Sequence, residues 1–342
     1  MKIMQGYMHG INLGGWFSQC DHTEERYDTF ITEEDIAHIR DWGLDHVRLP
    51  IDYDLVEYAD GSYKEAGFAR IQKVIDWCGS YGLNLVLDLH KTFGFSFDDG
   101  EEESGFFENP DYQERFYRLW EQFALRFGKY EDRIAFELLN EVTAKEYCSK
   151  WNEIAAECIR RIRAISGSIT ILVGGYYNNS IEALRDLDPP QDENIVYNFH
   201  CYEPLIFTHQ GAYWVRGMDT SFRMPISMTY GEYAEKATQQ IDYYYTDLSG
   251  FDQDAKFGTE FFEEIIKEAV QVAQERNVAL YCGEFGVIDL ASPEDTLEWY
   301  RMICSVFDKY GIGRAAWSYR AMDFGFTDER LSGVIDDIVR LL

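Results

Sequence analysis

Residues 135–142 read Ala-Phe-Glu-Leu-Leu-Asn-Glu-Val, and residues 281–286 read Tyr-Cys-Gly-Glu-Phe-Gly. Each stretch is a short apolar strand candidate that ends at a carboxylate, Glu141 in the first and Glu284 in the second. Glutamate is depleted in strands, so this pattern predicts that the two carboxylates meet at one rim of the fold. A facing pair of carboxylates is typical of glycoside hydrolysis, in which one acts as acid/base and the other as nucleophile or base.

The rest of the chain repeats an alternation of strand and helix. The helical period is clear at 71–78 and 151–162, and Thr32 is a plausible N-cap for a first helix that opens at Glu33. Eight βα units in succession predict an α/β protein, a (β/α)8 TIM barrel with parallel strands. We therefore expect residues 1–342 to form a single catalytic domain. The strand candidates are residues 7–13, 44–49, 83–90, 133–141, 168–174, 194–202, 278–285 and 313–319.

The alternation breaks once, between the sixth strand and the next helix, at residues 203–258. A connection of that length is usually a functional loop or a small subdomain, and here it would sit on the catalytic face of the barrel. A disordered linker is the alternative, but the segment is too aromatic for one. We expect an inserted subdomain, either a lid over substrate or a stabilising cap. Its aromatic residues include Trp214, Phe222, Tyr230, Tyr233 and Tyr243-Tyr244-Tyr245.

Composition narrows the classes of partner. A net charge of −30 argues against nucleic acid and against an anionic membrane surface, and it also serves solubility. The 7 Cys include no CxxC pair, which favours reduced thiols over a disulfide framework. The N-terminal residues 1–6 lack a secretion signal, so the chain as given reads as cytoplasmic, and a secreted protein with its signal removed would read the same way. We expect a monomer without cofactor or metal.

In a TIM barrel the C-terminal strand ends supply the reactive groups. Polar or aromatic side chains stand at six of the eight predicted strand ends. Each has a structural alternative: an ion pair for Arg48, a hydrogen-bonded core position for either histidine, and packing for Trp317. Convergence on one opening favours the functional interpretation. The residues are Arg48, His90, Asn140, Glu141, His200, Tyr202, Glu284 and Trp317.

Glu137 is the other acid of the fourth strand. It lies four residues before Glu141, about 13 Å deeper at the usual rise of a strand, so we expect a buried structural acid with partners. Motifs of competing chemistries are missing: the chain has no HExxH, no GxGxxG, no GxxxxGK[ST] and no GxSxG.

Six motifs together resemble glycoside hydrolase family 5, especially the compact clostridial endoglucanase C type, which also has a subdomain after the sixth strand. The resemblance runs in order over nearly the whole chain. The motifs are residues 10–16, Gly-Ile-Asn-Leu-Gly-Gly-Trp; 46–50, His-Val-Arg-Leu-Pro; 87–90, Leu-Asp-Leu-His; 136–141, Phe-Glu-Leu-Leu-Asn-Glu; 200–202, His-Cys-Tyr; and 283–286, Gly-Glu-Phe-Gly.

The resemblance implies a retaining mechanism on β-linked glycans. Carried over by position, Glu141 is the acid/base and Glu284 the nucleophile. Arg48 and Tyr202 would hold Glu284 ionised and oriented, and Asn140 would bond the sugar 2-hydroxyl. The resemblance further implies that His90 and His200 line the −1 subsite, that Trp317 forms its stacking floor, and that the peptide after Trp317 is cis.

The implied activity is a retaining endo-β-glucanase acting on β-1,4 bonds of cellulose-like or mixed-linkage glucans. The alternatives are an exo-acting β-glucanase or a β-mannanase on the same scaffold, and a glycan-binding protein without catalysis. One stretch departs from the family pattern. Residues 91–94 read Lys-Thr-Phe-Gly where relatives often place a second histidine or an aromatic, which leaves the polymer preference open.

Overall fold

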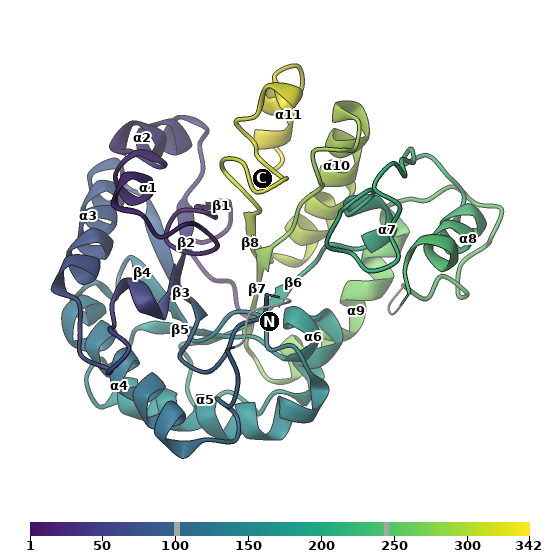
Figure 1. The fold of residues 1–342 in the computed structure, drawn as a ribbon. Helices are drawn as coiled ribbons and strands as arrows, with labels where there is room; N and C mark the ends of the chain where they lie inside the picture. The colour runs from purple at the N-terminus through teal and green to yellow at the C-terminus, as the bar shows by residue number, and fades with distance from the viewer. Residues whose placement is uncertain (99–102, 243–245) are drawn as a thin grey trace.

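Eight parallel strands form a closed barrel in chain order, as predicted (Figure 1). The computed structural model describes residues 1–98, 103–242 and 246–342. Every predicted strand is present, and each pairs in parallel with the next along the chain, while β8 closes on β1. The strands are β1 (Gly10–Asn12), β2 (His46–Asp52), β3 (Asn84–Lys91), β4 (Ile134–Glu137), β5 (Thr170–Val173), β6 (Ile195–His200), β7 (Ala279–Glu284) and β8 (Gly313–Ala316).

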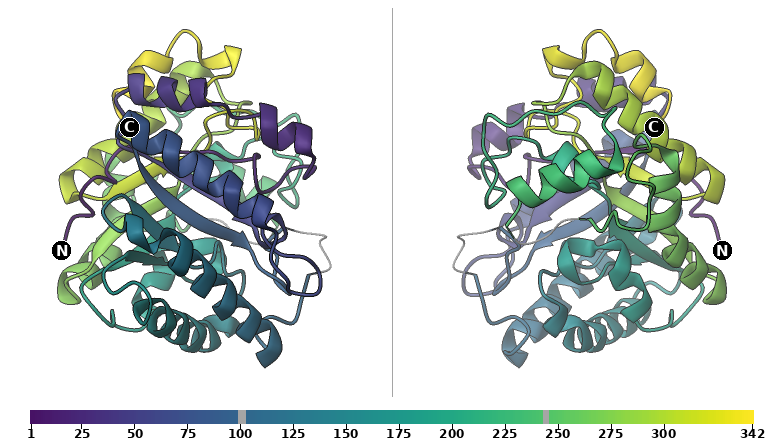
Figure 2. Two further views of the ribbon diagram at one scale, coloured as in Figure 1. Left: turned by 90° about the vertical axis from the view of Figure 1, so that its left-hand side faces the viewer. Right: turned by 90° about the vertical axis from the view of Figure 1, so that its right-hand side faces the viewer.

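Helices surround the barrel, and Figure 2 shows α3 and α4 lying along its outer face. Thr32 caps α2 as predicted, because its backbone N–H donates to the Asp35 carboxylate at 2.8 Å. The shorter α1 precedes α2, so Glu33 does not open the first helix. The α-helices are α1 (Glu24–Thr29), α2 (Glu33–Asp41), α3 (Glu65–Tyr81), α4 (Pro110–Phe127), α5 (Cys148–Arg163), α6 (Tyr176–Asn179), α7 (Leu205–Thr208), α8 (Tyr230–Gln240), α9 (Thr259–Glu275), α10 (Pro293–Tyr310) and α11 (Ile335–Val339).

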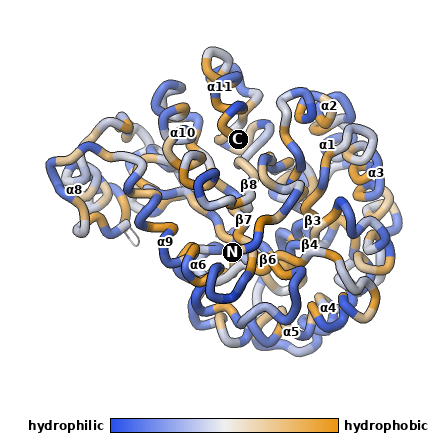
Figure 3. The backbone as a smooth tube through the Cα atoms, turned by 180° about the vertical axis from the view of Figure 1, so that it is seen from behind, coloured by the Kyte–Doolittle hydropathy of each residue, from blue (hydrophilic) through white to orange (hydrophobic). Residues whose placement is uncertain are grey.

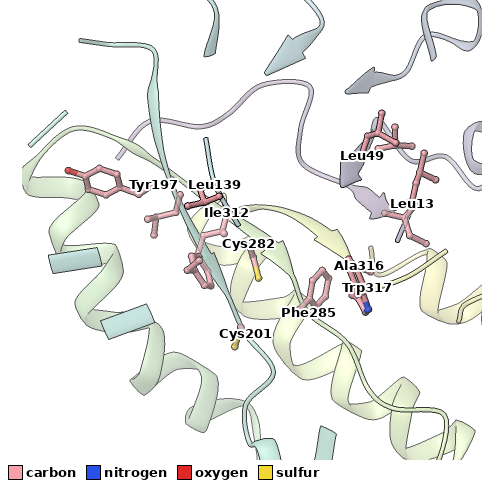
Figure 4. Close-up of a cluster of buried hydrophobic side chains, with 14 of the residues drawn as sticks. Leu13, Leu49, Leu139, Tyr197, Cys201, Cys282, Phe285, Ile312, Ala316 and Trp317 are labelled. Carbon is pink, nitrogen blue, oxygen red and sulfur yellow. The ribbon is translucent and has the colours of Figure 1, made fainter. Parts of the chain in front are cut away.

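The core consists of two apolar layers, one inside the barrel and one between the strands and the helices. Hydrophobic residues follow the strands at the centre, and hydrophilic residues dominate the outer surfaces of the helices (Figure 3). Between sheet and helices, Phe285 lies beside Ala316 and Trp317 (Figure 4). A separate cluster, which includes Val86 and Leu172 from β3 and β5, fills one part of the barrel interior. The barrel interior is therefore packed, with apolar side chains in this cluster and with buried polar side chains such as His46 and Arg48 beside it.

Three strands end two or more residues earlier than the sequence predicted. β4 stops at Glu137, β6 at His200 and β8 at Ala316, so Glu141, Tyr202 and Trp317 lie in the loops that follow. In the first of these loops Glu141 has a φ of 39°, which is outside the strand region. The early end of β4 also removes the basis for the 13 Å spacing between its two acids, because that spacing assumed an extended strand.

Between β6 and α9 the chain forms α7 and α8, and Figures 1 and 2 show α8 standing outside the helical ring. Tyr230 and Tyr233 of α8 are buried and stack on Phe251 and Phe257 respectively. These two tyrosines therefore pack the segment internally, whereas Trp214 remains 40% exposed. Residues 243–245 lie outside the described part of the chain, and the role of 203–258 as lid or cap stays a prediction.

All seven cysteines are free thiols, as their spacing predicted. Five of them are buried, where they serve as small apolar side chains. Within the described residues, no helix combines the length and apolar character needed to cross a lipid bilayer.

Candidate active site

Arg48 stands at the centre of the polar end of the barrel and is fully buried. Its Nε and Nη2 atoms donate to the two carboxylate oxygens of Glu137, both at 2.7 Å. Its Nη1 atom donates to Glu284 Oε1 at 2.7 Å, and Nη2 also donates to Asn140 Oδ1 at 2.8 Å. Burial opposes the charge, but the surrounding carboxylates of Asp88, Glu137 and Glu284 raise the pKa of Arg48 well above its usual value. The guanidinium is therefore a fixed positive centre.

Glu284 ends β7 and is nearly buried. Besides its bond from Arg48, it accepts a hydrogen bond from the Tyr202 hydroxyl to Oε2 at 2.9 Å. Burial and the nearby charge of Glu284 raise the pKa of Tyr202 well above its usual value, so the phenol keeps its proton and donates it. Two donors on separate oxygens hold this carboxylate in one orientation.

Glu141 follows β4, and its surroundings differ from those of Glu284. Burial raises the pKa of its carboxyl, and a hydrogen bond from the Asn178 amide to Oε2 at 2.9 Å partly offsets that effect. His200 Nδ1 lies 2.8 Å from Oε1 of the same carboxylate. No guanidinium contacts Glu141 in the described structure, so this carboxyl is the one suited to carry a proton.

The pKa values of the two histidines are shifted in opposite directions. Burial lowers the pKa of His200 to about 4, so its ring is neutral. His90 is also buried, but the Asp88 carboxylate, 2.5 Å from its Nδ1, outweighs burial and raises the pKa of His90. The His90 ring stacks on Trp317 with 2° between their planes and 5.9 Å between centroids. The Trp317–Ser318 peptide is cis, which confirms that prediction.

The two carboxylates lie close together. One ligand atom from each of Glu141, His200 and Glu284 lies within 4.8 Å of the other two. An oxygen of Glu141 is therefore no more than 4.8 Å from an oxygen of Glu284. His22, Asp52 and Asp54 form a second such cluster among the described residues. Both clusters have atoms of the kinds that bind metals. Glu284, Glu141 and Asp52 each have a hydrogen-bond partner within the protein, whereas Oδ1 of Asp54 has none among the described residues.

All eight residues chosen from the sequence belong to one connected set of side-chain contacts, in which Asp88 links His90 and Trp317 to Arg48. Asn140 is fully buried, and its Nδ2 has no hydrogen-bond partner within the described residues. A buried donor without a partner is unfavourable by about 1–3 kcal/mol, unless a ligand accepts the bond. The expected acid Glu137 is buried with partners, since Asn198 also donates to it at 2.8 Å.

Sequence reasoning missed several residues of this network. Asn12, at the end of β1, accepts from Arg48 Nη1 at 2.9 Å and donates to the Gly283 carbonyl at 2.8 Å. Asp88 pairs with Arg48 at 3.0 Å, and its position two residues before His90 on one strand face was a usable signal. Asn178 lies in the segment after β5. The predicted fifth strand ended at residue 174, so no sequence pattern pointed to Asn178.

The loop that begins with the departure at residues 91–94 places an aromatic side chain against His90. Phe97 packs edge-on against His90 with 4.8 Å between ring centroids, so this loop does supply an aromatic beside the histidine. Lys91 pairs with Asp98 at 2.6 Å, and Phe93 instead packs against Tyr112.

Comparison with known proteins agrees with this geometry. Residues 8–323 match the profile described as Cellulase (glycosyl hydrolase family 5). The chain is 47% identical over 337 residues to cellodextrinase A of Ruminococcus flavefaciens, covering 98% of this chain and 93% of that protein. It is 38% identical over 344 residues to endoglucanase C of Acetivibrio thermocellus, covering 99% and 98%.

A solved structure of Thermotoga maritima Cel5A with cellobiose superposes with a TM-score of 0.76 at 25% identity, covering 98% of this chain and 97% of that one. Its likeness extends the agreement from sequence to the whole barrel. The family profile, the two full-length relatives and the paired carboxylates lead to one conclusion: the chain is a glycoside hydrolase and belongs to glycosyl hydrolase family 5, the cellulase family.

Proposed function

We propose that the protein is a retaining endo-β-1,4-glucanase that cleaves cellulose-like or mixed-linkage β-glucans by double displacement. The observation that carries the proposal is the carboxylate pair, with atoms of Glu141 and Glu284 within 4.8 Å of each other in opposite electrostatic surroundings. The relatives named for cellodextrin and endoglucanase activity support the substrate class.

In the first step, Glu284 attacks the anomeric carbon while Glu141 gives its proton to the departing glycosidic oxygen. Arg48 and Tyr202 each hold one oxygen of the attacking carboxylate at 2.7 and 2.9 Å, which orients it without a solvent shell. In the second step, Glu141 takes a proton from water, and that water releases the sugar from Glu284.

Asn140 and the stacked pair of His90 and Trp317 supply the sugar contacts at the reacting centre. The free Nδ2 of Asn140 is a donor for the 2-hydroxyl, where hydrogen bonds strengthen in the oxocarbenium-like transition state. The face of Trp317 offers a flat surface for the ring of the sugar.

The direct test of the mechanism is proton NMR of the first product anomer from cellopentaose. We expect the β-anomer first, followed by mutarotation, and initial formation of the α-anomer would overturn the retaining scheme. Glu284→Gln should reduce turnover to the background rate, because an amide cannot form the glycosyl ester. Near wild-type turnover in that variant would refute the nucleophile assignment.

The endo mode and the polymer are tested by product length. On barley β-glucan and carboxymethylcellulose we expect a rapid fall in viscosity with mixed oligosaccharide lengths. Release of one short product at constant viscosity would show exo action, and preferential cleavage of mannan would show a mannanase.

Trp214 is the part of the 203–258 segment that bears on substrate length. It packs edge-on against His209 and lies beside Phe324, and both of those rings contact Tyr202. A continuous set of rings thus runs from the nucleophile's partner to an exposed tryptophan. Trp214→Ala should reduce activity on long glucans more than on cellotriose, and an equal effect on both would refute the role.

A further inference from the structure

The segment after β5, which contains the short element α6, has an unusual backbone. Tyr177, Asn178 and Asn179 have φ values of 50°, 56° and 56°, so three consecutive residues are left-handed. Asn179 N–H donates to the Gly175 carbonyl at 3.2 Å, and Ser180 N–H donates to that of Tyr176 at 3.1 Å. Left-handed turns are unfavourable by roughly 1–2 kcal/mol per residue, and asparagine tolerates them better than tyrosine. Such conformations persist mainly where a site requires them.

This left-handed turn holds the loop that carries Glu141 at two points. The backbone N–H of Asn178 donates to the Val142 carbonyl at 3.0 Å, and its side-chain Nδ2 donates to Glu141 Oε2 at 2.9 Å. One residue therefore fixes both the backbone and the carboxylate of the neighbouring loop. Because Glu141 itself has a φ of 39°, its position is not set by regular strand pairing and depends on such contacts.

The next residue supports the other side of the same carboxylate. Asn179 is fully buried, and its Nδ2 lies 3.4 Å from His200 Nε2. The opposite nitrogen of that ring lies 2.8 Å from Glu141 Oε1. A side chain at Gly174 would place its Cβ 2.2 Å from Asn179 Oδ1, so glycine is needed there for the turn to sit this close.

We propose that Asn178 is a positioning residue that orients Glu141 and favours its ionised form for the second half of the reaction. The inference rests on the proposed acid/base function of Glu141. A donor to a carboxylate stabilises the ionised state, which is the state that must accept a proton from water. The other groups that face Glu141 are His200 from β6 and Glu284 from β7, with the charges of Arg48, His90 and Asp98 further away.

The variant Asn178→Gly removes only the side chain, because glycine keeps the left-handed backbone and its N–H to Val142. Asn178→Asp keeps the shape but replaces the donor by an acceptor. Asn178 itself is exposed, so folding should survive these changes of its side chain. The matched control is Asn277→Gly, which changes another exposed left-handed asparagine, with φ 50°, ahead of β7.

The measurement is kcat/KM against pH on a cello-oligosaccharide. Loss of a donor to Glu141 raises its pKa, so the basic limb, where activity falls as Glu141 ionises, should move upward by about one pH unit in Asn178→Gly. Asn178→Asp should move it further, and Asn277→Gly should leave it in place. A limb unchanged in both Asn178 variants would overturn the positioning role.

One further variant separates this inference from the function beneath it. In Glu141→Gln, residual activity on an aryl cellobioside with a good leaving group should show no basic limb. A limb that persists there would overturn the acid/base assignment and the inference together. If the basic limb is lost in Glu141→Gln but is unchanged in the Asn178 variants, only the inference about Asn178 is refuted.

Discussion

The guanidinium of Arg48 contacts Glu284 Oε1 at 2.7 Å from a position that is itself fully buried. On its other side the same group is paired through two nitrogens with Glu137, which lies at the end of β4. Glu284 is therefore tied to the barrel interior by a planar cation whose five donors have fixed directions. Orientation of Glu284 and stability of the barrel depend on one residue.

Arg48→Lys should test that dependence. Lysine keeps the charge but cannot bridge Glu137 and Glu284, so we expect the free energy of unfolding to fall on the order of 3 kcal/mol, with a large loss of kcat. Urea unfolding followed by fluorescence measures the first effect. Arg160→Lys, at an exposed pair with Glu157, is the control and should change stability by no more than about 0.5 kcal/mol. Equal changes in both variants would contradict the central role of Arg48.

Glu141→Ala should affect substrates according to their leaving groups. On natural glucans we expect turnover to fall by about 10²–10⁴-fold, because the departing oxygen needs a proton. Aryl cellobiosides with acidic phenols need little protonation, so their glycosylation step should be nearly preserved. Steady-state and pre-steady-state rates on both substrate types make the comparison, and an equal loss on both would count against the acid role.

The pH–rate profile of the wild-type protein should be bell-shaped. Activity should fall at high pH as Glu141, whose pKa is raised by burial, loses its proton. Both limbs belong to the interacting pair rather than to either residue alone. Initial rates on cellopentaose over a range of pH give the profile, and activity that stays constant on the alkaline side would contradict this division of protonation states.

His22 should make stability depend on pH. Its hydrogen bond with Asp52, with Cys20 and Asp54 also near, raises the pKa of His22 to about 10. Because the folded pKa exceeds the unfolded value of about 6.5, the contribution is complete below pH 6.5 and is lost as pH rises through about 10.

The measurement is the difference in Tm between the wild-type protein and His22→Gln across that range. We expect a difference of about 2 °C near pH 6 that shrinks towards pH 10. His38→Gln is the control, because the His38 ring is hydrogen-bonded at 3.1 Å to the Tyr319 hydroxyl, whereas His22 is paired with a carboxylate. A difference that stays constant with pH would show that the His22 interaction is not ionic.

Local residue patterns explain which strands and which site residues could be predicted from the sequence. The strand periodicity placed all eight strands, and the residues predicted at the ends of six of them contact one another in the structure. The same approach placed Glu141, Tyr202 and Trp317 on strands that were too long. The strands were predicted too long because the conformation of the loops that follow them is not encoded locally. The φ of 39° at Glu141, for example, is set by contacts with other loops and has no counterpart in the neighbouring sequence.

Sequence patterns alone were enough to predict the barrel, the pair of Glu141 and Glu284, and the arginine that contacts Glu284, because strand alternation and barrel closure bring C-terminal strand ends to one face. Only the tertiary structure decided how β1 and β5 contribute. Asn12 meets Arg48, and Asn178 meets Glu141, across separations of 36 and 37 residues. The direction of such side chains depends on backbone angles and on neighbours from other strands. Those neighbours are assembled only when the barrel closes.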